Sequence, residues 1–167
     1  DVGGTNTRLK LLSVEATASL KDGEAPPGTI IFERKYQNSN FKSLLDVVKT
    51  FLEDAEKAVG APTAPTTPQP QAACLAVAGV VEANQCRLTN IDWVVDGDDM
   101  AQELGMKPGN LEIINDFVAQ GYGILTLGAA DVIPLTDARP TPGAPIACLG
   151  AGTGLGECFL CPGRDGQ

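Results

Sequence analysis

The hydrophobic residues of this chain follow two different periods, and each period predicts a different kind of element. Over residues 41–59, apolar side chains recur at spacings of three and four with Lys and Glu between them, which predicts an amphipathic helix. Ser39 or Asn40 is a suitable N-cap for this helix, and Gly60 is expected to end it. The continuous apolar run over 72–78 instead predicts a central strand that is covered on both faces.

Shorter apolar runs predict further elements along the rest of the chain. A helix over 100–104 is expected to be capped by Asp98 and ended by Gly105. Strands at first, and then helices alternating with strands, predict an α/β fold. The Pro-rich segment 61–71 is interpreted as a surface insertion, because a buried strand follows it directly. The remaining strands are expected over residues 8–14, 29–36, 111–114, 132–135, 146–149 and 157–161.

Composition and charge limit the classes of partner. The chain has 167 residues, with 12 Lys and Arg against 21 Asp and Glu, and its net charge is −9. This acidic balance disfavours nucleic acid and an anionic membrane as the main partner. It does not disfavour a phosphorylated ligand, because backbone N–H groups bind phosphate with little side-chain charge. No apolar run reaches the ~18 residues that a membrane-spanning helix needs.

Five cysteines and no histidine argue against a metal centre built from these side chains. Cys74 and Cys148 lie in apolar runs and are expected to be packed thiols. Cys158 and Cys161 have CxxC spacing, but a single pair favours ordinary strand positions over a metal site. An odd number of cysteines fits a reducing, cytoplasmic compartment best, while a removed leader and an organellar location stay open.

A polar pair stands where one predicted strand stops and a helix opens. Asn115 and Asp116 follow the apolar run 111–114, and apolar residues at helical spacing come after them. The carboxyl end of a strand is where α/β sheets place their ligand sites. Asp116 is equally suited to cap the helix and do nothing more. The pair alone does not decide between a ligand site and a helix cap.

Two glycine-rich turns are further candidates for chemistry. Residues 1–6 and 150–156 offer backbone N–H groups unobstructed by Cβ atoms, and each turn adds a hydroxyl, from Thr5 and from Thr153. Successive N–H groups in such turns form an anion-binding nest. A tight hairpin that uses glycine for positive φ is the alternative for either turn taken alone.

The better-known phosphate loops do not match these turns. A Walker A loop requires Gly-Lys-Ser/Thr, which is absent from the sequence. The dinucleotide fingerprint would require glycine at position 155 or 157, where Leu155 and Glu157 stand, and a helix where a strand is predicted. A phosphate site here is therefore expected to be of the hairpin type.

The glycine-rich turn at 1–6, the polar pair Asn115 and Asp116 and the glycine-rich turn at 150–156 belong to three motifs that follow one another along the chain. Together, in this order, these motifs resemble the bacterial-type glucokinases of the sugar-kinase, hexokinase and actin-like superfamily. The resemblance covers nearly the whole chain. A fourth segment, Leu88-Thr-Asn-Ile-Asp-Trp93, is similar to the family's Thr-Asn…Trp segment near the sugar. One departure is Gly79, because the family usually has proline after the central strand. The three motifs are Asp1-Val-Gly-Gly-Thr-Asn6, Ile114-Asn-Asp-Phe117 and Leu149-Gly-Ala-Gly-Thr-Gly-Leu-Gly156.

The resemblance implies a fold and an extent. It implies a ribonuclease H-like, or actin-like ATPase, domain over residues 1–136, with a mixed sheet flanked by helices. Residues 137–167 would then be the first strands of a second such domain. The family's Glu and Gly-Gly-His sugar-binding segment would lie beyond Gln167, so we expect these residues to be the N-terminal part of a longer enzyme.

The resemblance also implies roles for single residues. Asp116 would accept the proton of the sugar 6-hydroxyl, while Asn115, Asp116 and Asn90 would contact the sugar. For Asn90, a plain turn residue is the alternative. Asp1 would lie near Mg²⁺ and contact it through water. The phosphates of ATP would be held by Gly3, Gly4, Thr5 and Asn6 in the first turn and by Gly152, Thr153 and Gly154 in the second.

The implied activity is phosphorylation of glucose by ATP to glucose 6-phosphate, the first step of glycolysis. Residues 1–167 alone are expected to be inactive, because two domains must close around the sugar to exclude water. A kinase for another hexose and a non-catalytic sugar-binding regulator of the same fold are the alternatives. A hairpin-rich structural module would require all three motifs to be coincidental. Whether the full-length protein is a homo-oligomer stays open.

Overall fold

The computed structural model describes residues 1–15, 24, 28–59, 70–151 and 155–163. The chain divides into two compact units, one of Asp1–Ala16 with Gly28–Asp116 and one of Thr17–Pro27 with Phe117–Gln167. Gly60 and most of the predicted Pro-rich insertion at 61–71 lie outside the described residues.

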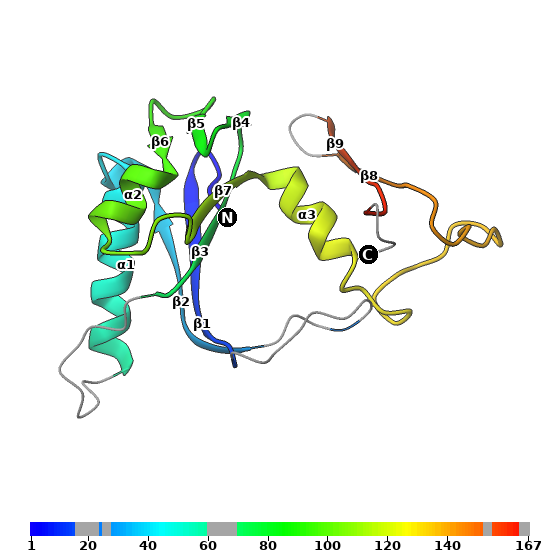
Figure 1. The fold of residues 1–167 in the computed structure, drawn as a ribbon, viewed down its shortest axis with the longest axis horizontal. Helices are drawn as coiled ribbons and strands as arrows, with labels where there is room; N and C mark the ends of the chain where they lie inside the picture. The colour runs from blue at the N-terminus through cyan, green and yellow to red at the C-terminus, as the bar shows by residue number, and fades with distance from the viewer. Residues whose placement is uncertain (16–23, 25–27, 60–69, 152–154, 164–167) are drawn as a thin grey trace. The chain divides into compact units, whose positions relative to one another are not determined.

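The first unit is built on a mixed sheet (Figure 1). Strands β1 (Asn6–Ser13) and β2 (Thr29–Gln37) pair antiparallel, and β3 (Ala73–Val77) pairs parallel with β7 (Leu111–Asn115). Val2 joins the two pairs, because it forms an antiparallel bridge to Thr7 and a parallel bridge to Val77. The α/β class and these four strands were predicted from the apolar runs, and both are confirmed.

A small antiparallel sheet was not predicted. It consists of β4 (Val81–Glu82), β5 (Gln85–Arg87) and β6 (Val94–Asp96). Its strands have only two or three residues, too few to display a period of two. The turn between β4 and β5 places Ala83 and Asn84 at φ 49° and 59°, as expected for a two-residue hairpin turn.

Helix α1 (Leu44–Val59) confirms the longest predicted helix but begins later than expected. The Ser43 Oγ accepts a hydrogen bond from the Asp46 N–H at 3.1 Å, so Ser43 caps the helix. The predicted caps Ser39 and Asn40 are wrong, because both belong to a preceding 3₁₀ turn, η1 (Asn38–Asn40).

Helix α2 (Gly97–Glu103) confirms the second predicted helix with a different cap. The Asp96 carboxylate accepts hydrogen bonds from the N–H groups of Asp98 and Asp99, so the prediction of Asp98 as cap is wrong. The predicted end is confirmed. Gly105 has φ 67°, and its N–H and that of the next residue bond back into the last turn, as in a Schellman motif.

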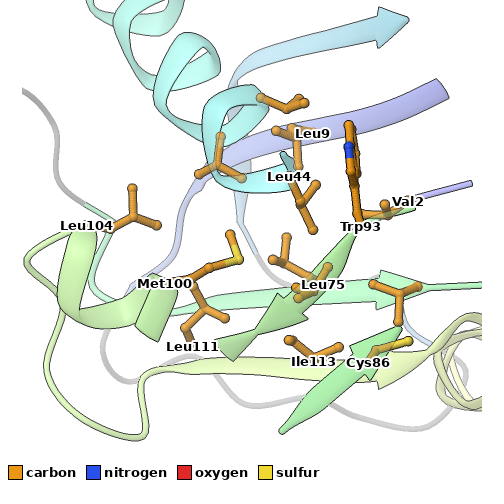
Figure 2. Close-up of a cluster of buried hydrophobic side chains, with 14 of the residues drawn as sticks. Val2, Leu9, Leu44, Leu75, Cys86, Trp93, Met100, Leu104, Leu111 and Ile113 are labelled. Atoms are coloured by element: carbon orange, nitrogen blue, oxygen red, sulfur yellow. The ribbon is translucent and has the colours of Figure 1, made fainter. Parts of the chain in front are cut away.

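One hydrophobic core lies on one side of the mixed sheet, under α1 and α2 (Figure 1). Figure 2 shows Leu44, Leu75 and Met100 side by side within this cluster. These side chains come from one helix, the central strand and the other helix, so the core holds all three elements together. Other buried members are Val2, Leu9, Val47, Phe51, Val77, Cys86, Trp93, Val95, Leu104, Leu111 and Ile113.

The prediction that the central strand is covered on both faces is wrong for the described part of the chain. In β3, Leu75 and Val77 are buried, but Cys74 is exposed, so Cys74 is not the packed thiol that was expected. The register pairs Cys74 with Glu112, whose side chain is also exposed. The outward positions of β3 carry only small side chains, and a run of small apolar residues does not reveal which face is open.

The second unit contains α3 (Asp116–Ile124), which begins at the last residue of the first unit, and the hairpin of β8 (Ile146–Ala151) and β9 (Leu155–Leu160). This hairpin was predicted and is confirmed, and Cys148 is buried as expected. The predicted strand at 132–135 is wrong. Ile133 and Leu135 are about nine-tenths exposed there, and Pro134 has no N–H to donate to a partner strand. Of the described helices, none combines the length and apolar character that crossing a membrane requires.

Candidate functional site

The first glycine-rich turn leaves the mixed sheet at the carboxyl end of β3. The Val2 N–H donates to the Ala76 carbonyl at 2.8 Å, and the Val2 carbonyl accepts from the Ala78 N–H at 3.2 Å. The chain then turns, and the Gly3 N–H donates to the Asn6 carbonyl at 3.0 Å. The turn is thus held at both ends by the sheet.

The polar pair Asn115 and Asp116 lies at the same edge of the sheet as this turn. Val77 is the register partner of Asn115 in β7 and also bridges Val2 in parallel. Val2 and Asn115 are therefore two strand spacings apart, about 10 Å. Because all three segments run parallel, the turn that follows Val2 and the residues that follow Asn115 lie at one edge. Asp116 is the first residue of α3, where the N-terminal end of the helix dipole favours a negative charge.

The Asn115 side chain is held by the loop after the central strand. Its Nδ2 donates to the Gly79 carbonyl at 3.0 Å. A Cβ atom at position 79 would lie 2.6 Å from the Cys86 Sγ, so this loop needs a glycine where the resembling family usually has proline. The departure from the family pattern therefore has a packing reason in this chain.

Asn90 lies against the first glycine-rich turn. It belongs to the turn between β5 and β6, which the Leu88 N–H closes by donating to the Trp93 carbonyl at 3.0 Å. A Cβ atom on Gly4 would lie 2.6 Å from the Asn90 Cβ. Trp93 is buried and anchors this turn in the core. Asn90 is therefore a turn residue, as the alternative had it, and also a neighbour of Gly4.

The second glycine-rich turn is described only at its flanks, because Gly152, Thr153 and Gly154 lie outside the described residues. Gly150 and Gly156 face each other across β8 and β9. The Phe117 ring fills the space beside both glycines: a Cβ on Gly150 would lie 2.7 Å from the ring, and one on Gly156 would overlap it. The aromatic residue of the Asn-Asp-Phe motif thus packs on the base of this hairpin.

Two asparagines that support the site were missed. Asn38 is 1% exposed and donates to the Gly3 carbonyl from its side chain at 2.7 Å. The Asn84 side chain bonds to the backbone of β7 at Leu111 and Ile113. Each lies about thirty residues from its partners along the sequence, and such long-range contacts leave no periodic signal. At each place the local residue composition indicates only a turn.

The described residues contain no group of three or more His, Cys, Asp or Glu side chains that suits a metal ion. Asp1 is exposed, and its carbonyl accepts from the Arg8 N–H at 2.8 Å. A Mg²⁺ ion at this turn would therefore take most of its oxygen ligands from water and phosphate, which is its usual preference. Cys158 lies opposite the buried Cys148 in the hairpin, and Cys161 is exposed beyond its end.

The fold and this polar edge define an α/β protein that presents a glycine-rich turn and an Asn-Asp pair at the carboxyl ends of its strands, where such sheets bind ligands. The family model described as Glucokinase matches residues 1–167. The chain belongs to the glucokinase family.

Curated relatives and a solved structure agree with this assignment. A protein named glucokinase from Synechocystis sp. (strain PCC 6803) is 42% identical over 167 residues, covering 100% of this chain and 44% of the relative. Glucokinases from Nostoc punctiforme and Yersinia pestis are 38% and 35% identical over 96% of the chain, covering 41% and 42% of their own lengths. The crystal structure of a glucokinase from an Antarctic psychrotroph matches with a TM-score of 0.72 and 27% identity, over 98% of this chain and 45% of that one. The chain thus spans less than half the length of these relatives.

Proposed function

We propose that the protein containing these residues transfers a phosphoryl group from ATP to the 6-hydroxyl of glucose, giving glucose 6-phosphate. The observation that carries the proposal is the position of Asn115 and Asp116 at the same sheet edge as the turn after Val2. The family assignment and the names of the relatives supply the substrate class.

In this proposal, Asp116 is the catalytic base. The 6-hydroxyl oxygen forms a bond to the γ-phosphorus, the bond from that phosphorus to the ADP oxygen breaks, and the hydroxyl proton passes to the Asp116 carboxylate. Phosphoryl transfer has a loose transition state, so the proton is accepted late and a carboxylate is a sufficient base. Asp116 is the first residue of α3, so the start of this helix sets the position of the carboxylate at the sheet edge.

Asn115 and Asn90 are the proposed sugar ligands on this side of the site. An amide both donates and accepts, which suits adjacent sugar hydroxyls better than a carboxylate alone. The hydrogen bond from the Asn115 Nδ2 to the Gly79 carbonyl fixes the plane of the amide before any sugar arrives. A preset amide reduces the ordering that binding would otherwise require.

ATP and Mg²⁺ are the proposed partners of the glycine-rich turns. When bound, they supply the phosphoryl group and neutralise its charge. Asp1 would contact the ion through water. We further propose that the first unit belongs to a ribonuclease H-like domain over residues 1–136 and that residues 137–167 begin a second one. The phosphate ligands would be Gly3, Gly4, Thr5 and Asn6, together with Gly152, Thr153 and Gly154.

A coupled assay of the whole protein across hexoses and phosphoryl donors tests this function. We expect the highest kcat/KM for glucose with ATP. A higher kcat/KM for another hexose would change the proposed substrate but leave the proposed reaction, phosphoryl transfer to a hexose, unchanged. Saturable glucose binding with no product from any donor would contradict the proposal and favour the sugar-binding regulator.

A further inference from the structure

Asn38 hydrogen-bonds to the first glycine-rich turn through both its side chain and its backbone. Its Nδ2 donates to the Gly3 carbonyl at 2.7 Å and, in a longer contact, to the Gly4 carbonyl at 3.3 Å. Its backbone N–H donates to the Thr5 carbonyl at 2.9 Å. Three successive carbonyl groups of the turn are therefore directed at one residue.

The orientation of the Asn38 amide is fixed by its partners. The Thr7 Oγ donates to the Asn38 Oδ1 at 2.8 Å, and the carbonyls of Gly3 and Gly4 can only accept. Among the residues that the structure describes, Thr7 and Asn38 are the buried polar side chains, 0% and 1% exposed. Burying two polar groups is favourable only when their hydrogen bonds are made, so this pair has one stable arrangement.

The direction of the carbonyls sets the direction of the N–H groups that follow them. In a trans peptide, the C=O and the N–H point to opposite sides of the chain. Because the Gly3 and Gly4 carbonyls face Asn38, the N–H groups of Gly4 and Thr5 face away from it. Within the described part of the chain, neither N–H donates to a protein acceptor. The turn therefore presents two adjacent outward donors, which is the arrangement of an anion nest.

We infer that Asn38 is the positioning residue of this phosphate turn. It acts through the peptide planes of Gly3 and Gly4, and it touches no ligand itself. This inference rests on the proposed function, since it assigns the outward N–H groups of Gly4 and Thr5 to the phosphates of ATP. It adds a residue from the 3₁₀ turn η1, outside all the glycine-rich motifs of the sequence.

Calorimetric titration of the whole protein with ATP and, separately, with glucose tests the inference. Asn38→Asp keeps the size of the side chain and its acceptor for Thr7, but removes both donors and turns a carboxylate toward two carbonyls. We expect the dissociation constant for ATP to rise by about tenfold or more, because each N–H to phosphate bond is charge-assisted. The constant for glucose should stay within about twofold. Asn40→Asp is the matched control, since it adds the same charge at an exposed position of the same turn and should change neither constant.

The outcomes separate the inference from the function on which it rests. Equal ATP affinity of Asn38→Asp and Asn40→Asp, or an equal loss of glucose affinity, would overturn the positioning role while the kinase function stands. A wild-type protein that binds no ATP would overturn both. If circular dichroism shows that Asn38→Asp does not fold, Thr7→Val is the variant that tests the inference. It leaves the Asn38 Oδ1 without its donor, so we expect ATP binding to weaken severalfold, and unchanged ATP binding would overturn the inference.

Discussion

The Asn84 side chain hydrogen-bonds to the backbone of β7 at Ile113, as a neighbouring strand would. Its Oδ1 accepts from the Ile113 N–H at 2.9 Å, and its Nδ2 donates to the Leu111 carbonyl at 3.0 Å. One side chain thus pairs two backbone groups at the edge of β7, and one of them, the Ile113 N–H, lies two residues before Asn115. The Asn84 carbonyl also accepts from the Gly97 N–H at 2.9 Å, which ties the start of α2 to the same point.

Removing the Asn84 side chain should loosen β7. Asn84→Gly is the suitable change, because glycine keeps the positive φ of 59° without strain. We expect a loss of about 1–3 kcal/mol in the free energy of unfolding, since two backbone groups of β7 lose their partners. Urea unfolding of the wild-type protein and of the variant measures this loss. Ala83→Gly is the control at the adjacent positive φ, and it should be neutral or stabilising. Equal effects of the two changes would show that the turn, and not the amide, matters.

The two glycines of the first turn should respond differently to alanine. A Cβ on Gly4 would lie 2.6 Å from the Asn90 Cβ, whereas one on Gly3 would be 3.4 Å from the Asn6 carbonyl oxygen, an ordinary contact. We expect Gly4→Ala to displace Asn90 and to raise the KM for glucose by about tenfold, of the order of one lost hydrogen bond. Gly3→Ala should leave that KM nearly unchanged. Steady-state kinetics of both variants measures the difference, and equal KM values would place the sugar away from Asn90.

Tyr36 should make stability depend on alkaline pH. Its hydroxyl donates to the Asp54 carboxylate at 2.7 Å, and burial together with that carboxylate raises the pKa of Tyr36 well above its ordinary value. The unfolded chain loses the phenol proton from about pH 10 upward, while the folded chain retains it. The contribution of Tyr36 to stability is therefore complete below pH 10 and is lost as the pH rises above it.

Comparison with Tyr36→Phe isolates this effect from other alkaline titrations. Near neutral pH, the variant should be less stable by about 1 kcal/mol, for one lost hydrogen bond. The difference in unfolding free energy between the two proteins should shrink above pH 10. Urea unfolding at several pH values measures it. A difference that stays constant across this range would mean that the pKa of Tyr36 is not raised.

The sequence predicted the features that follow from the spacing and the ends of its apolar runs. The apolar spacing predicted α1, and the end of an apolar run predicted that Asn115 and Asp116 stand where a strand passes into a helix, which is the junction of β7 and α3. Caps were misplaced by a few residues, because Ser39 and Asn40 suit the role as well as Ser43 does. The roles of Asn38 and Asn84 depend on partners about thirty positions away. Only the folded chain brings such residues together, so no local pattern predicts them.

Asp116 carries the central claim, and its removal tests the claim most directly. In the whole protein, we expect Asp116→Ala to lower kcat by at least about 10²-fold, the usual contribution of a general base, while calorimetry still detects glucose binding. Glu112→Ala removes an exposed carboxylate from β7, the strand that precedes Asp116, and should leave kcat unchanged. Near-normal turnover by Asp116→Ala would contradict the assignment of the base.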